Sequence, residues 1–113
     1  MKILIDHCAP APLCRHLHSH FVETAAQHGW EEKENGDLLS AAEADGFDCM
    51  ITADKNISCQ QNMSARKIAI VLLSQPYWPA VKLHVGLVED ALNLVKSNAF
   101  IEVEIPDLPS LRI

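Results

Sequence analysis

The run IAIVLLS, residues 68–74, constrains the fold more than any other stretch because it is apolar on both of its faces. A strand with one face in water alternates apolar and polar residues. A strand of a parallel sheet is instead covered by helices on both sides and is apolar throughout. The run therefore predicts a buried strand in a parallel α/β sheet.

The remaining segments alternate between strand-like and helix-like patterns. Short apolar runs predict further strands at 2–5, around 21–22, at 47–52 and, half-exposed, at 100–105. Apolar spacing and the placement of proline and glycine predict helices within 9–20, 37–46, 56–67 and 80–97. We expect one domain over residues 1–113, with a mostly parallel central sheet and helices on both faces.

Composition limits the classes of function. With 49% hydrophobic and 21% charged residues, the chain has globular composition. Its net charge of -6 argues against a broad basic surface for nucleic acid, although carboxylates that bind a cation also make the count negative. No apolar run approaches the roughly 20 residues that span a bilayer, and the first residues do not resemble a signal peptide. A cytoplasmic location without membrane contact is expected.

Three acids occupy matching positions in this pattern. Asp6 follows the strand-like ILI, Asp54 follows MITA, and Asp37 begins the helix that leads into the strand at 47–52. The carboxyl ends of parallel strands meet at one edge of the sheet, about 4.8 Å apart when the strands are neighbours. Carboxylates that converge there repel one another unless a cation neutralises them, and hard oxygen ligands suit Mg²⁺ or Mn²⁺.

Each acid also has an ordinary structural interpretation. Asp37 is suited to cap a helix, Asp54 lies in the turn-like sequence ADKN, and Asp6 could simply end a strand.

The stretches ILIDHCAP, GWEEKENGDLLSAAEADGFDCMITADKNISCQQN and KIAIVLLS together resemble the short bacterial PIN-like domains, over roughly residues 1–75. Many members of that family are toxin components of toxin–antitoxin pairs. The resemblance implies a three-layer α/β/α fold, a metal-dependent ribonuclease site and an antitoxin partner. By the motif match, the metal positions are Asp6, Asp37 and Asp54.

The sequence departs from the family pattern at two positions. His7 stands where Glu or Asn usually follows the first Asp, and Asn56 stands where a further Asp is common. Glu43 is one candidate stand-in for a fourth acid. A catalytically weak or inactive module that binds RNA or a partner protein is therefore the alternative function.

Further side chains would assist a nuclease. Asn56 and Thr52 would orient water or a carboxylate, and His7 beside Asp6 would carry a proton. The candidates for RNA contact are Lys55, Gln61, Asn62 and Arg66. Ordinary solvent-exposed positions are the alternative for His7 and for the four candidates for RNA contact.

Two further hypotheses concern a homodimer and a signalling function. The half-exposed strand at 100–105 and the apolar stripe of the helix at 80–97 would suit a homodimer. A phosphoacceptor domain also has an Asp after its first and third strands. That domain requires an acid pair after the first strand, but His7 and Cys8 follow Asp6 here.

Overall fold

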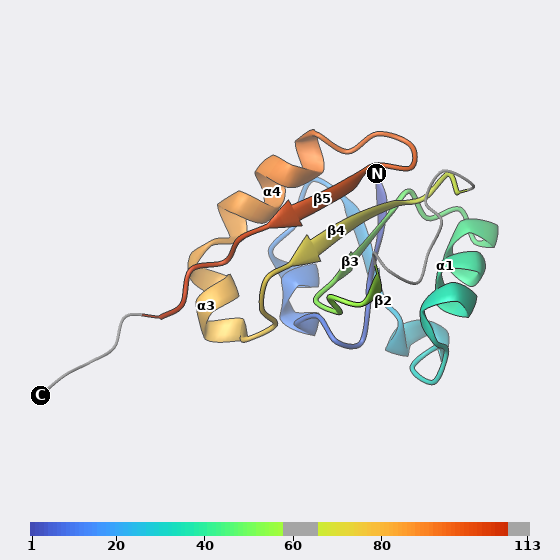
Figure 1. Cartoon of the computed structure of the whole chain (residues 1–113), viewed down its shortest axis with the longest axis horizontal. Coiled ribbons are helices and arrows are strands. Elements are labelled where there is room, and N and C mark those ends of the chain that lie inside the picture. The colour runs from blue at the N-terminus through green and yellow to red at the C-terminus, as the bar shows by residue number, and fades with distance from the viewer. Residues whose placement is uncertain (58–65, 109–113) are drawn as a thin grey trace, which may run out of the picture.

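The central feature of the fold is a five-stranded sheet in which every strand is parallel to its neighbours (Figure 1). A computed structural model describes residues 1–57 and 66–108 of the chain. The strands are β1 (Lys2–Ile5), β2 (Phe21–Thr24), β3 (Cys49–Thr52), β4 (Ala69–Leu73) and β5 (Phe100–Val103). The expectation of a mostly parallel α/β sheet is confirmed.

The helical segments within 9–20 and 80–97 are shorter than the sequence pattern predicts, whereas the helix predicted at 37–46 has the expected length and begins two residues earlier. They are the 3-10 helices η1 (Ala11–Arg15) and η2 (Ala26–His28), and the α-helices α1 (Asn35–Ala44), α3 (Trp78–Leu83) and α4 (Val85–Asn93). Pro10 is the N-cap of η1 and Pro12 lies in its first turn, where a backbone N–H would have no helical partner. The helix expected at 56–67 falls mostly outside the described residues.

The prediction of one continuous helix over 80–97 is wrong. The helix breaks at His84, whose backbone leaves the α-helical region with φ -127° and ψ 28°. Gly86, a residue of low helix propensity, lies two positions further on.

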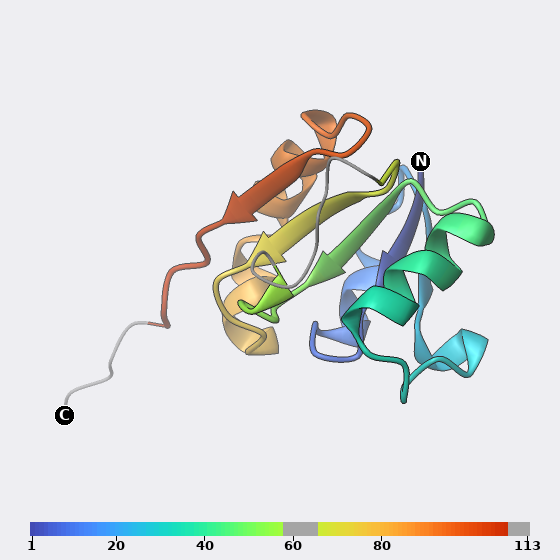
Figure 2. The same cartoon turned by 45° about the vertical axis from the view of Figure 1, so that its right-hand side comes forward.

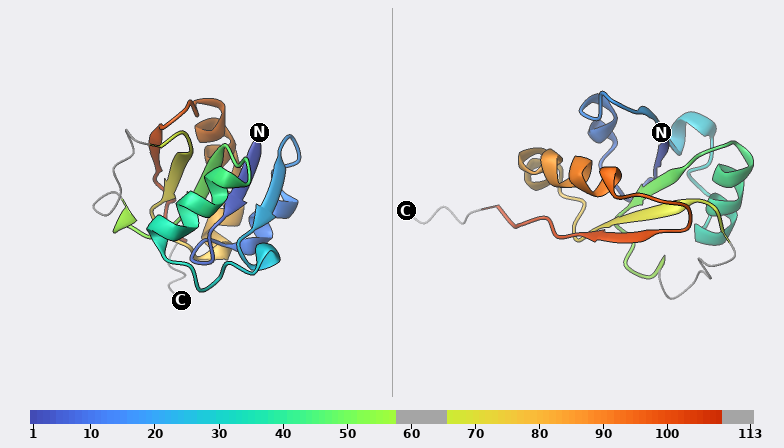
Figure 3. Two further views of the ribbon diagram at one scale, coloured as in Figure 1. Left: turned by 90° about the vertical axis from the view of Figure 1, so that its right-hand side faces the viewer. Right: turned by 90° about the horizontal axis from the view of Figure 1, so that it is seen from above.

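Two apolar clusters cover the two faces of the sheet, because successive strand residues point to opposite sides. On one side, even-numbered strand residues such as Leu4 and Met50 pack with Leu38, Leu39 and Ala42 of α1. On the other side, odd-numbered residues such as Ile3, Ile51 and Val71 pack with Leu13 of η1, Val81 of α3, and Val88 and Leu92 of α4. Figures 2 and 3 show α1 on one side of the sheet and α3 and α4 on the other. The expectation of helices on both faces is confirmed.

The strand at 68–74 owes its composition to this double cover. All five residues of β4 are buried, and burying one Leu, Ile or Val fully is worth about 1.5–3 kcal/mol. β5 lies at the border of the sheet and exposes Glu102, as a half-exposed strand should. Within the described residues, no helix has both the length and the apolar character needed to cross a bilayer.

The order β2-β1-β3-β4-β5 creates a switch point between β1 and β3. The chain runs from β1 outward to β2, then returns through α1 to β3 on the other side of β1. We call the side where the strands end the carboxyl edge and the side where they begin the amino edge. In open parallel sheets, ligands bind at the carboxyl edge beside such a switch point.

Candidate functional site

Asp6 and Asp54 lie at the carboxyl edge, on the two strands that flank the switch point. Asp6 directly follows β1, and its N–H still bonds to the carbonyl oxygen of Ile51 in β3 at 2.9 Å. Asp54 lies two residues beyond the end of β3. β1 and β3 are hydrogen-bonded neighbours with Ile5 opposite Ile51. Two of the three predicted acids therefore follow adjacent strands at the same edge.

The Asp6 carboxylate is buried and surrounded by hydrogen-bond donors. Only 1% of Asp6 is exposed. Its Oδ1 accepts the His7 backbone N–H at 2.7 Å and lies 2.9 Å from His7 Nδ1, which donates when that nitrogen carries a proton. Its Oδ2 accepts the Thr52 hydroxyl at 2.8 Å and the Cys8 thiol at 3.0 Å. These donors compensate for the water that a buried carboxylate loses.

Thr52 connects the two acids. While its hydroxyl donates to Asp6, the same oxygen accepts the Asp54 backbone N–H at 3.1 Å. Thr52 is itself fully buried at the end of β3. The Thr52 side chain, at the end of β3, thus positions both the carboxylate of Asp6 and the backbone of Asp54.

Cys8 belongs to this site, although its sequence position alone did not indicate it. Its sulfur lies 3.1 Å from Thr52 Oγ1 and donates to Asp6. Burial raises the pKa of the Cys8 thiol, and the hydrogen bond to Asp6 raises it further. Cys8 therefore stays a neutral donor at physiological pH. The available signal was its place two residues after Asp6, within the turn closed by the Ala9 N–H on the Asp6 carbonyl oxygen at 3.0 Å.

Asp54 forms the turn that its sequence suggested, and it also lies in the candidate site. Its Oδ1 accepts the Asn56 backbone N–H at 3.0 Å, and its carbonyl oxygen accepts the Ile57 N–H at 3.2 Å. Asp54 is half-buried, whereas Lys55 and Asn56 are exposed. The predicted role of the Asn56 side chain in orienting water stays a prediction.

Asp37 lies on α1, apart from the hydrogen bonds that join Asp6, Thr52 and Asp54. It is the third residue of the helix and is exposed. The N-cap position belongs to Glu34, so Asp37 acts within the first turn, where a negative charge favours the helix dipole. Because α1 leads from the end of β2 back to the start of β3, its first turn belongs to the carboxyl edge.

The same direction of α1 places Glu43 at the other edge. Glu43 lines a cavity together with Met1, Asp48 and Lys67, which all precede strands. Its Oε1 lies 3.3 Å from Nη1 of Arg66. Glu43 is therefore no stand-in for a fourth acid beside Asp6.

Arg66, a predicted RNA contact, lies along α1. Its guanidinium donates to Ser40 Oγ and Glu43 Oε1 at 3.3 Å and to the Gly36 carbonyl oxygen at 3.4 Å. Lys55 is exposed and borders a small hollow of about 170 Å³ at the carboxyl edge, beside Ser74. Gln61 and Asn62 lie outside the described residues.

The oxygen atoms at the carboxyl edge are of the kind that binds a hard cation, although they already take part in hydrogen bonds within the protein. Within residues 1–57 and 66–108, no three His, Cys, Asp or Glu side chains are grouped so that they could hold a metal ion. Asp6, Asp54 and Thr52 nevertheless supply the oxygen ligands that Mg²⁺ and Mn²⁺ prefer. A cation on Asp6 would replace its weakest donor, the Cys8 thiol, or the exposed His7 imidazole.

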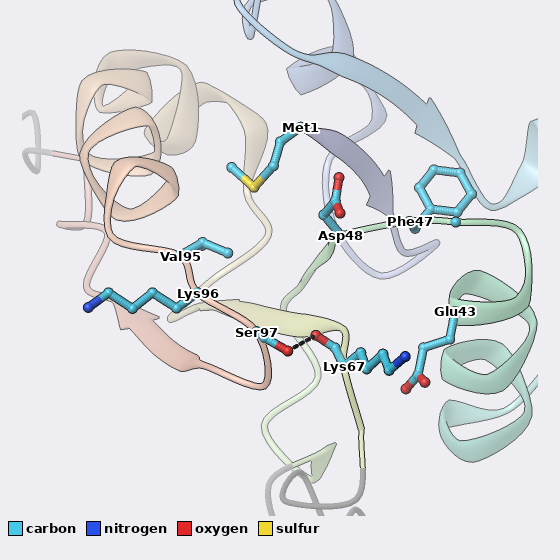
Figure 4. Close-up of a pocket in the computed structure, with 9 residues that line it drawn as sticks. Met1, Glu43, Phe47, Asp48, Lys67, Val95, Lys96 and Ser97 are labelled. Carbon is cyan, nitrogen blue, oxygen red and sulfur yellow. Dashed lines mark hydrogen bonds between the residues drawn. The ribbon is translucent and has the colours of Figure 1, made fainter.

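A cavity at the amino edge differs in character from the carboxyl edge (Figure 4). Its volume is about 490 Å³. Lys67 and Glu43 extend toward each other across it, while Lys96 points away. The Ser97 hydroxyl donates to the Lys67 carbonyl oxygen at 3.2 Å. The lining mixes both charges and apolar side chains, and the cavity lies at the opposite edge from Asp6.

Comparison with known proteins adds no relative. The chain matches no family model, no curated protein and no solved structure.

Proposed function

We propose that this chain is a metal-dependent ribonuclease of the PIN-like kind, with its active site at the carboxyl edge between β1 and β3. The observation that carries the proposal is the link from Asp6 through the Thr52 hydroxyl to the backbone of Asp54. Acids after two adjacent parallel strands, at the switch point of the sheet, occupy the position where such folds bind ligands. The motif resemblance supplies the reaction class.

In this proposal Asp6 and Asp54 would hold Mg²⁺ or Mn²⁺, and Asp37, which is not grouped with them in the structure, would complete the ligand set only if the first turn of α1 came closer. The bound ion would lower the pKa of a water molecule and stabilise the charge that develops on the phosphate. The protein's part is to fix the ligands. Thr52 and the His7 backbone N–H set the orientation of the Asp6 carboxylate before any ligand arrives.

His7 and Lys55 would act on the substrate side. The His7 side chain is 50% exposed and rests against Asp6 through Nδ1, so the carboxylate orients a ring that can exchange protons with solvent. Lys55 is exposed next to Asp54 and would bind a backbone phosphate. An antitoxin that covers this edge would explain how a cell tolerates the activity.

The donors on Asp6 favour a second candidate. Both carboxylate oxygens already accept hydrogen bonds from protein groups, including the thiol of Cys8. A carboxylate satisfied in this way can serve as a structural anchor, and the chain would then bind RNA or a partner protein without cutting RNA.

A cleavage assay separates the two functions. Purified protein is incubated with labelled single-stranded RNA in Mn²⁺, in Mg²⁺ and in chelator, and binding is measured in parallel. The ribonuclease predicts cleavage that requires the metal and disappears in Asp6→Asn. RNA binding without cleavage under any metal would support the binding module, and the absence of both would contradict the proposal.

A further inference from the structure

β5 forms one border of the sheet, and one side of its backbone faces away from the other strands (Figure 2). The carbonyl oxygens of Ala99 and Val103 accept N–H groups of β4 and of Ser74 at 2.9 and 3.0 Å. Ile105 continues this alternation, because its N–H donates to Ser74 Oγ at 2.7 Å. The residues in between direct their N–H and C=O groups outward. They are Phe100, Glu102 and Glu104.

The opposite border of the sheet is partly closed by its own chain. The Phe21 N–H donates to the Met1 carbonyl oxygen at 3.1 Å, so Val22 and Thr24 are the residues of β2 that face outward. The Thr24 N–H, however, donates to Gln27 Oε1 at 2.8 Å. In the part of the chain that the structure describes, no group bonds in this way to the outward side of β5. β5 is therefore the border better suited to accept a further strand.

The two faces of this border differ in character, because successive side chains of a strand point to opposite faces. Ile101, Val103 and Ile105 pack in the apolar cluster on the α4 side. Glu102 and Glu104 point to the α1 side, and both are exposed. Side chains of paired strands contact one another on the same face. A strand that fits here therefore carries basic residues on one face and apolar residues on the other.

The charge of this border distinguishes a partner protein from a second copy of the chain. Asp107, just beyond the two glutamates, is also acidic and exposed. Lys55 lines the hollow of about 170 Å³ beside Glu102 and offsets one of these charges. When two copies of β5 pair antiparallel over their common length, glutamate lies opposite glutamate, which is destabilising. The same acids that oppose self-association favour a basic strand.

We infer that the outer side of residues 100–105, which we call the β5 border, binds an extended basic segment of a partner protein. The segment alternates basic and apolar residues and adds a further strand to the sheet. The β5 border ends at Pro106, which has no backbone N–H to donate. The inference does not depend on the proposed function, because neither Asp6 nor Asp54 contributes to this border.

Hydrogen exchange measured by NMR tests the addition of a strand. The probe is a blocked peptide of about eight residues that alternates lysine and valine, and the control peptide alternates glutamate and valine. In the free protein, the amides of Phe100, Glu102 and Glu104 should exchange fast, whereas those of Ile101 and Val103 should be protected. Saturating lysine peptide should slow exchange at the three outward amides by about tenfold or more. The control peptide should leave all five rates unchanged.

Fluorescence anisotropy of the labelled lysine peptide measures how charge and backbone contribute. The double variant Glu102→Lys/Glu104→Lys should weaken binding by about tenfold or more, and salt should weaken binding to the wild type. Glu102→Pro also removes an N–H that is not used in the pairing with β4, so it should weaken binding more than Glu102→Gln. Glu31→Lys makes the same kind of charge change in an exposed loop after η2 and should have no effect.

Three results would overturn the inference. The first is protection of the amides of Phe100, Glu102 and Glu104 in the free protein, which would show that this border is already paired. The second is the absence of lysine peptide binding at low salt. The third is binding without slower exchange at these amides, which would reduce the contact to a general attraction of charges. If circular dichroism shows that Glu102→Pro is unfolded, the double charge reversal and the exchange rates still decide.

Discussion

The two edges of the sheet differ, and the size of their cavities does not show which edge is the better candidate for a functional site. The amino edge holds the larger cavity, about 490 Å³, but its charged groups are spread over a mixed lining. The hollow described at the carboxyl edge is smaller, about 170 Å³, yet this edge holds a buried carboxylate with hydrogen-bond donors on both oxygens, linked through Thr52 to a second acid. Chemistry depends on groups held in fixed relation to one another, so the smaller feature is the stronger candidate.

The largest expected difference between the edges is in catalysis. Asp54 follows β3 and Asp48 precedes it, so Asp54→Asn and Asp48→Asn make the same change at opposite ends of one strand. We expect Asp54→Asn to lower RNA cleavage by about 10²-fold or more, as when a group that stabilises transition-state charge is lost. Asp48→Asn should leave the rate nearly unchanged. Equal losses in initial-rate assays would remove the distinction between the edges.

The next effect concerns the stability of the carboxyl edge. Thr52→Val removes the hydroxyl that donates to Asp6 and accepts from Asp54. We expect a loss of about 1–3 kcal/mol in the free energy of unfolding, because buried polar groups lose their partner. Thr24→Val is the matched control at the end of β2, where the hydroxyl accepts the Gln27 N–H in an exposed turn.

Urea denaturation measures both variants. Thr24→Val should cost clearly less than Thr52→Val. A smaller cost for Thr52→Val than for its control would show that the network around Asp6 contributes little.

Alkaline pH tests the amino edge through Cys49, the first residue of β3. Burial, and then the charge of Asp48, raises the pKa of this thiol from 9.0 to about 12. Only the unfolded chain loses the proton between these values, so the stability that Cys49 contributes is intact below pH 9 and declines as the pH rises toward 12. The expected slope is roughly 1 kcal/mol per pH unit. The slope should be shallower in Cys49→Ala when urea denaturation is repeated from pH 8 to pH 11, and an unchanged slope would contradict the assignment.

The smallest expected effect is on the reactivity of Cys8. Because the hydrogen bond to Asp6 helps to raise the pKa of Cys8, Asp6→Asn should lower it and increase the thiolate fraction. Iodoacetamide should then label Cys8 several-fold faster at pH 8, as followed by peptide mass spectrometry. Cys49, at the amino edge of the same molecule, serves as the internal control. Faster labelling of both cysteines would indicate unfolding instead.

Much of the fold could be predicted from the sequence, because a strand buried on both faces is apolar throughout. The fully apolar run at 68–74 identified β4, and the positions of Asp6 and Asp54 followed from where the strands end. The direction of α1 was also predictable. Glu43 was nevertheless kept as a stand-in for a fourth acid, and the structure corrects this because α1 carries Glu43 from the carboxyl edge to the amino edge, away from Asp6.

Thr52 was expected to orient a carboxylate and His7 to act beside Asp6, but the contact of Cys8 with Asp6 was not predicted. Cys8 and His7 reach the carboxylate because the turn after β1 folds their side chains back, and composition carries no signal for that geometry. The break at His84 was missed for a similar reason, since the apolar spacing continues across it. Local backbone geometry decides such details.

Paramagnetic broadening of amide NMR signals by Mn²⁺ tests the central claim most directly, because it reports where a cation binds without requiring turnover. We predict broadening concentrated around Asp6, Asp54 and the first turn of α1, removed by Asp54→Asn and retained in Asp48→Asn. Broadening around Asp48 and Glu43 at the amino edge, or none at any Mn²⁺ concentration, would contradict the assignment of the carboxyl edge as the active site.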